Sequence, residues 1–191
     1  IVWFQLLELV VGSSAISLGI LLGTFMGGMC LGSVLLPRLI SRNHHPFHVY
    51  ALLELGIAIF AIIVFFEVPL VGRIYTGSGT DGLSGILLRA AIAGLCLLPP
   101  TILMGATLPA IARWVETTPR GVGWLGVLYS SNIAGGIFGC MLAGFYLLRV
   151  YDMAMAMCVA VMINVGVGVI GFQLARRRSH RPIVPASGRA P

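Results

Sequence analysis

The chain has 191 residues, of which 58% are hydrophobic and only 9% are charged, whereas about a quarter of the residues of an ordinary soluble domain are charged. This composition excludes a soluble globular protein and a disordered one, because the apolar excess is too large for polar surface to cover and must face lipid. The charged residues are 6 acids and 12 arginines, with a net charge of +6.

Stretches without charge predict the membrane spans, since a helix needs about 20 apolar residues to cross the core of a bilayer. Four such stretches hold no charge, and a fifth contains only Glu54. We therefore expect an all-α integral membrane protein with five complete transmembrane helices. These are expected near 15–37, 48–66, 86–112, 121–148 and 153–175.

The first ten residues are apolar but too few to span a membrane, and they do not begin with methionine. We expect them to be the end of an earlier helix or an interfacial segment of a chain whose start is missing. An earlier helix would make six in the intact half bundle. No basic stretch precedes the apolar run, so we do not expect a signal peptide.

The arginines predict the orientation, because loops rich in arginine stay on the cytoplasmic side. Those on the predicted cytoplasmic side are Arg38, Arg42, Arg113, Arg120, Arg176, Arg177, Arg178, Arg181 and Arg189. The remaining connections, 67–85 and 149–152, balance arginine with acid. We expect residue 1 outside and the C-terminus in the cytoplasm, in the plasma membrane, which in a bacterium is the inner membrane.

The domain organisation is a transmembrane domain, 1–175, followed by a basic, proline-rich cytoplasmic tail, 176–191, without fixed structure. The cluster from Arg176 to Arg181 could bind nucleic acid, but directly after a span it is better interpreted as an anchor on anionic lipid. The expected partners are therefore the lipid bilayer and anionic headgroups, and not nucleic acid.

The 25 glycines suit close packing of helices in lipid, where small residues let backbones approach. In the first span Gly19, Gly23 and Gly27 recur every four residues, with Gly28 and Gly32 on a neighbouring row. The fourth span has the same spacing, with Gly135, Gly139 and Ala143 on one row and Gly136, Cys140 and Gly144 on the neighbouring row. We expect these rows to be seams within the bundle rather than sites of self-dimerisation.

The third span is interrupted by Pro99 and Pro100, which remove two backbone donors, so the helix should kink or break near Leu98. Broken helices within a membrane mark the binding sites of transporters, although a simple proline kink is the commoner outcome. Thr101, Thr107 and Pro109 extend this polar segment.

Glu54 is the acidic residue deepest in a span, about two helical turns inside the predicted cytoplasmic face. It could receive a cationic substrate, carry a proton, or pair with an arginine of the 38–42 connection. Asn132 can bond across helices, and that structural role competes with ligand binding. The candidate substrate path consists of Glu54, Pro99, Pro100, Thr101 and Asn132.

Other chemistry is not indicated, and we expect no catalytic site, cofactor or metal. The four cysteines lie in spans without paired spacing, and the histidines at 44, 45 and 48 lack acidic or cysteine partners. The stretch from Gly121 to Gly126 matches a GxGxxG pattern, but no strand precedes it, so it does not indicate a nucleotide site.

Several strings resemble the membrane part of fused major facilitator and spermidine-synthase-like proteins. They are Trp3-Phe-Gln-Leu-Leu7, Gly12-Ser-Ser14, Phe25-Met-Gly-Gly-Met-Cys-Leu-Gly-Ser33, Pro100-Thr-Ile-Leu-Met-Gly-Ala-Thr-Leu-Pro109, Leu128-Tyr-Ser-Ser-Asn-Ile-Ala-Gly-Gly-Ile-Phe-Gly139 and Ala143-Gly-Phe-Tyr-Leu-Leu148. The stretch 32–42 is also similar to the basic loop between the second and third helices of major facilitator transporters. The resemblance implies a half bundle in which the five spans are helices two to six.

In that family an aminopropyltransferase domain follows the membrane part, and no residues here match its glycine-rich loop or its aspartates. The resemblance implies a transporter-like module that works with a spermidine-synthase-like catalytic domain and handles a polyamine or related cation. The alternatives are a non-transporting anchor or oligomerisation domain of such an enzyme, and an aminopropyltransferase whose catalytic domain lies beyond this sequence.

Overall fold

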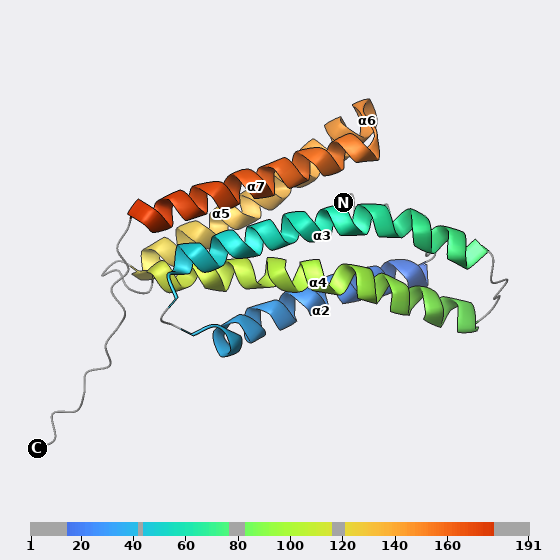
Figure 1. The fold of residues 1–191 in the computed structure, drawn as a ribbon, viewed down its shortest axis with the longest axis horizontal. Coiled ribbons are helices and arrows are strands. Elements are labelled where there is room, and N and C mark those ends of the chain that lie inside the picture. The colour runs from blue at the N-terminus through green and yellow to red at the C-terminus, as the bar shows by residue number, and fades with distance from the viewer. Residues whose placement is uncertain (1–14, 42–43, 77–82, 116–120, 178–191) are drawn as a thin grey trace, which may run out of the picture.

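A computed structural model of the chain describes residues 15–41, 44–76, 83–115 and 121–177, and within these ranges the structure is helical. The elements in chain order are α2 (Ala15–Leu39), α3 (Pro46–Thr76), α4 (Leu83–Val115), α5 (Gly121–Met141), the π-helix η1 (Leu142–Leu147), α6 (Leu148–Val150) and α7 (Met153–Arg177). Figure 1 shows them as a bundle of long, roughly aligned helices.

The described residues include five segments that are long and apolar enough to cross a membrane, which confirms the predicted number of spans. They are Leu18–Leu39, Pro46–Glu67, Gly94–Val115, Gly123–Val150 and Met153–Arg177. A helix is the expected form of such segments, because it satisfies its own backbone hydrogen bonds where no water can. The sequence did not reveal that η1 and α6 continue α5 within the fourth span.

An aspartate and a proline mark the starts of two helices. Asp152 precedes α7, and its Oδ1 accepts a hydrogen bond of 2.8 Å from the backbone N–H of Met155, as the side chain before a helix commonly does. Pro46 opens α3, where its missing N–H costs nothing. At its other end, α7 runs to Arg177, two residues into the expected tail. The rest of the tail, 178–191, lies outside the described residues, as do the first ten residues.

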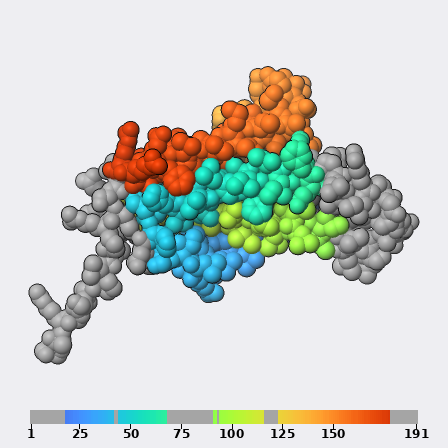
Figure 2. Space-filling model, in the orientation of Figure 1, coloured from blue at the N-terminus to red at the C-terminus, as the bar shows by residue number. Residues whose placement is uncertain are grey.

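Helix α4 is the centre of the bundle. It packs along α2 on one side and along α3 on another, while α3 also packs along α7 and α5 rests mainly on α4. Figure 2 shows the resulting order on one face of the molecule, from α7 through α3 to α4 and α2.

The described arginines of the predicted cytoplasmic side lie at one end of the bundle. Arg38 lies in the last turn of α2, Arg113 in the last turn of α4, and Arg176 and Arg177 in the last turn of α7. These helix ends lie on the same side in Figure 1, and we call this side the basic end. Arg149 lies in α6, near the opposite end.

Arg113 links α4 to the end of α2. Its guanidinium donates hydrogen bonds of 3.0 Å to the carbonyl of Ile40 and 3.3 Å to the carbonyl of Leu36. The last carbonyls of a helix have no partner within the helix, and a cation there also matches the helix dipole. Arg113 therefore caps α2 from a neighbouring helix.

The α2–α4 contact is made backbone to backbone. A Cβ atom added at Gly28 would overlap the hydroxyl of Thr101, one at Gly32 the carbonyl oxygen of Ile102, and one at Gly105 the carbonyl oxygen of Met29. The Gly28 and Gly32 row is thus the predicted intramolecular seam, joined by Gly105 from α4.

The other glycine rows meet no neighbour among the described residues. A Cβ atom at Gly19, Gly23 or Gly27 would meet nothing described within 4 Å, and the same holds at Gly135, Gly136 and Gly139. Rows of equal spacing lie side by side on one helix, and the rotation of α2 presents only one of them to α4. Helix α5 is exposed along most of its length.

Helix α4 does not break at its prolines, so the break that the sequence allowed is wrong. The helix is continuous from Leu83 to Val115 with Pro99, Pro100 and Pro109 inside it. Thr101 is fully buried against α2, and its hydroxyl lies 2.9 Å from the carbonyl oxygen of Leu97 and 3.0 Å from that of Leu98. The carbonyls that lose their helical donors to the two prolines are those of Leu95 and Cys96, four residues earlier, and the Thr101 hydroxyl bonds neither of them.

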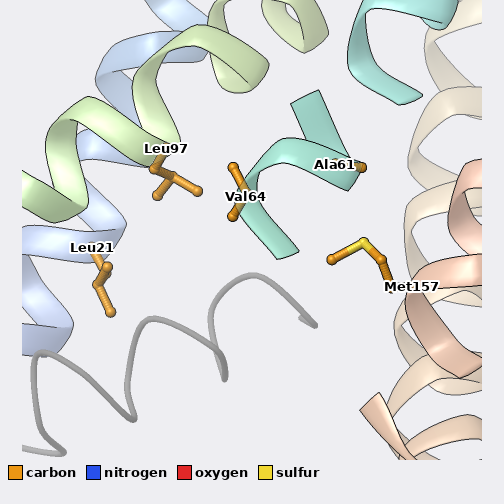
Figure 3. Close-up of a cluster of buried hydrophobic side chains, with 5 residues drawn as sticks. All are labelled: Leu21, Ala61, Val64, Leu97 and Met157. Carbon is orange, nitrogen blue, oxygen red and sulfur yellow. The ribbon is translucent and has the colours of Figure 1, made fainter. Parts of the chain in front are cut away.

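Two apolar clusters hold the ends of the bundle together. Away from the basic end, the buried cluster contains residues of α2, α3, α4 and α7, namely Leu21, Ala61, Val64, Leu97 and Met157 (Figure 3). Nearer the basic end, the buried cluster contains Leu36, Val49, Leu53, Ala106 and Ala110. Between them the clusters connect every long helix except α5.

We expect Gly32→Ala to lower the free energy of unfolding by about 2 kcal/mol, because the new methyl group overlaps backbone that can move only with the whole helix. The matched control is Gly23→Ala, on the same helix but with open space at the Cβ position. Unfolding in detergent, followed by circular dichroism, measures both. Equal losses in the two variants would contradict the seam.

We expect Arg113→Gln to cost about 2 kcal/mol of stability, because it removes two charged hydrogen bonds from the end of α2. Arg176→Gln is the control, since Arg176 is exposed at the same end. If the same unfolding assay gives the two variants equal stability, Arg113 does not cap α2.

Candidate functional site

A pocket lies between α3, α4, α5 and α7 in the half of the bundle nearer the basic end. Its volume is about 370 Å³, within the range of roughly 300–1,000 Å³ that holds small molecules. The residues that line it, which define the basic-end pocket, are Phe47, Tyr50, Glu54, Thr107, Leu108, Ile111, Leu128, Ser131, Asn132, Val167, Ile170, Gly171 and Leu174.

Glu54 is the acidic residue of the pocket and is only 8% exposed. It lies about 12 Å along α3 from Pro46, at 1.5 Å per residue. Tyr50, one turn earlier, brings its hydroxyl within hydrogen-bonding reach of the Glu54 carboxylate. A buried carboxylate is costly unless a positive charge or hydrogen-bond donors compensate it, and here the described compensation is one hydroxyl.

No arginine supplies the missing charge in the part of the chain that the structure describes. Arg38, one of the partners that the sequence suggested for Glu54, is exposed and makes no ion pair with it. Arg42 lies outside the described residues. Within the described ranges, the pocket therefore carries a carboxylate without a counter-ion.

The other polar side chains of the pocket offer oxygen atoms as acceptors. The hydroxyl of Thr107 donates to the carbonyl of Met104 at 2.7 Å, and the hydroxyl of Ser131 donates to the carbonyl of Leu128 at 2.9 Å. Since each hydroxyl has a single proton, both retain only lone pairs for a ligand. The amide of Asn132 adds a further acceptor, together with two donors.

The rest of the lining is apolar. Phe47 makes two aromatic contacts at the basic end: it lies 5.8 Å from His45 in a stacked arrangement and 5.1 Å from Trp114 in a tilted one, measured between ring centroids. His48 lies 5.7 Å from Phe172 in the same way. These rings join the start of α3 to the ends of α4 and α7, on the side of the pocket nearest the basic end.

The four walls of the pocket differ in exposure. On α3 and α4 the lining residues are buried or half-buried, whereas Ser131 and Asn132 on α5 and Ile170 and Leu174 on α7 are exposed. Helix α7 packs on α3 and α5 on α4, and the two meet each other only sparsely. The pocket thus has its floor on α3 and α4 and opens sideways between α5 and α7, a side that we call the mouth.

The structure brings together two of the five candidate residues. Glu54 and Asn132, far apart in the sequence, line the same pocket. Pro99, Pro100 and Thr101 do not line it, and Thr101 is buried in the α2–α4 seam. Whether any of the five acts on a substrate stays a prediction.

Two polar residues of the pocket, Tyr50 and Ser131, were missed in the sequence, whereas Thr107 belongs to the polar segment that the sequence indicated in the third span. Tyr50 lies one helical turn before Glu54, the spacing at which side chains share a face, so this signal was available. Ser131 gave no such signal, because a hydroxyl in a membrane helix commonly bonds its own backbone, as it does here. Its place in the pocket depends on how α5 is rotated.

Comparison with known proteins leaves the family open. No family model, curated protein or solved structure matches the chain at a significant level. The resemblance to fused major facilitator and spermidine-synthase-like proteins is therefore a prediction, and the pocket must be interpreted from its own chemistry.

We expect a cysteine at position 132 to react with a charged, membrane-impermeant thiosulfonate, because it lies in the same pocket as the Glu54 carboxylate, which water can reach from the basic end so that a thiolate forms. The background is a variant in which the four native cysteines are alanine. In it, Asn132→Cys should be labelled, whereas Thr101→Cys, which is fully buried, and Phe138→Cys, on the exposed apolar surface of α5, should not. Labelling of Phe138→Cys as fast as of Asn132→Cys would show that the reaction does not report the pocket.

Proposed function

We propose that the chain is a transporter-like membrane module that binds an organic cation in the basic-end pocket. The observation that carries the proposal is the Glu54 carboxylate, 8% exposed and without a counter-ion among the described residues. An ammonium group would supply the missing charge, and its N–H donors would meet the lone pairs of Glu54, Thr107 and Ser131. If the chain were only a membrane anchor or an oligomerisation domain, this buried carboxylate would have no role in its function.

The position of the pocket agrees with a path through the bundle. Its lining comes from four helices, and Glu54 lies about two helical turns inside a span, where ionisable residues are costly and commonly serve function. We further propose that the basic end faces the cytoplasm, as arginine-rich ends do. This orientation gives the pocket a short route to the cytoplasmic side and a longer one to the outer side.

The wider proposal follows the resemblance noted in the sequence. It comprises a half bundle of the major facilitator type with a sixth helix, the plasma membrane as location, and a spermidine-synthase-like catalytic domain as partner. Its support is the order of the quoted strings together with the all-helical fold. Co-purification of the chain with such an enzyme from the native membrane is the test of the partnership.

We expect Glu54→Gln to weaken cation binding by more than about 100-fold and to abolish uptake into proteoliposomes, because it removes the charge that a buried ammonium requires. The matched control is Glu67→Gln, since Glu67 lies on the same helix and is exposed. Uptake of labelled organic cations measures the effect. Unchanged uptake in Glu54→Gln would remove Glu54 from the mechanism, and no binding or uptake by the wild type would favour the anchor.

A further inference from the structure

We infer that the ligand of the basic-end pocket is an amphiphilic monoamine, a single ammonium group carried on an apolar tail, rather than a polyamine. This inference rests on the proposed function, since it specifies which cation Glu54 receives. It departs from the polyamine that the family resemblance implies. Three features of the pocket support it.

The first feature is the number of charges. Glu54 is the one acidic side chain among the described residues that line the pocket, so this lining can neutralise one ammonium group. A polyamine carries two or more, and each further ammonium placed in this lining would be buried without a counter-ion. Such burial is far more costly than the loss of a hydrogen bond.

The second feature is the apolar wall. Beyond the polar group around Glu54, the lining is aliphatic on three helices, with Leu108, Ile111, Leu128, Val167, Ile170 and Leu174. A polyamine alternates methylene segments with ammonium groups, and those ammonium groups would find no acceptor on this aliphatic surface. An unbranched apolar tail would remove it from contact with water, at a gain of about 0.8 kcal/mol for each buried CH₂ group.

The third feature is the mouth. Its residues on α7, Ile170 and Leu174, are apolar and remain 56% and 38% exposed, and the mouth opens to the side of the bundle. In a chain whose helices cross a bilayer, that side faces lipid. An amphiphilic amine concentrates in the bilayer and can enter from there, whereas a polyamine stays in water.

The test compares ligands of equal length and different charge on the wild-type protein in lipid nanodiscs. The probe is radiolabelled octylamine, displaced by unlabelled octylamine, by 1,8-diaminooctane, which adds a second ammonium at the far end, or by spermidine. We expect octylamine to bind more than about tenfold more tightly than either polycation, because only its tail can be buried without a charge. Octylamine that remains bound to nanodiscs of the Glu54→Gln variant measures partitioning into lipid, and this amount is subtracted from the wild-type value.

A gain-of-function variant completes the test. Ile170→Asp places a second carboxylate on the exposed wall of the mouth, and it should raise the affinity for 1,8-diaminooctane while lowering that for octylamine. Size-exclusion chromatography and circular dichroism establish that the variant is folded, and the ligand series on the wild type does not depend on it.

The possible results separate the two proposals. Glu54-dependent binding in which the diamine or spermidine is preferred would overturn the monoamine inference and keep the cation site. Displacement by none of the three amines, or displacement that is the same in Glu54→Gln, would overturn both.

Discussion

The contact of α2 with α4 through bare backbone is the constraint on which the other helices depend. Gly28, Gly32 and Gly105 leave no room for side chains, so the face of α4 that carries Thr101 and Gly105 must point at α2. Thr107 and Ile111, four residues apart on a different face, are then directed into the pocket. In lipid no hydrophobic force draws helices together, so a seam of this kind both joins two helices and fixes their rotation.

The pocket exists because α5 and α7 rest on different neighbours. Helix α7 packs on α3 and α5 on α4, and the sparse contact between them leaves space above Glu54. The carboxylate is thus held by two well-packed helices and faced by two that are less constrained. This arrangement suits a binding site whose floor on α3 and α4 is rigid and whose ligand enters from the side, between α5 and α7.

The sequence predicted what charge and length alone determine. Five spans and the alternation of arginine follow from the cost of placing a charge or an unpaired peptide group in lipid, and those costs do not depend on how the helices pack. Glu54 was singled out for the same reason.

The rotation of helices could not be predicted, because Gly27 and Gly28 are equally small and only the packing of α2 decides which one meets α4. For that reason Thr101, a candidate for the path, lies in a seam, whereas Ser131 lies in the pocket. The proline pair allowed a break in α4 but did not require one, because a proline removes one backbone hydrogen bond without having to end the helix.

The cap that Arg113 places on α2 has a consequence for biosynthesis. The carbonyl of Leu36 also accepts a hydrogen bond of 3.1 Å from the backbone N–H of Ile40, whereas the carbonyl of Ile40 receives its donor from Arg113, 73 positions later in the chain. When α2 first enters the bilayer, the carbonyl of Ile40 must therefore be hydrogen-bonded by water or headgroups, and Arg113 can reach it only after α4 has been made. The first helix of the described chain thus acquires its final end only when the third is in place, which orders the assembly of the bundle in time as well as in space.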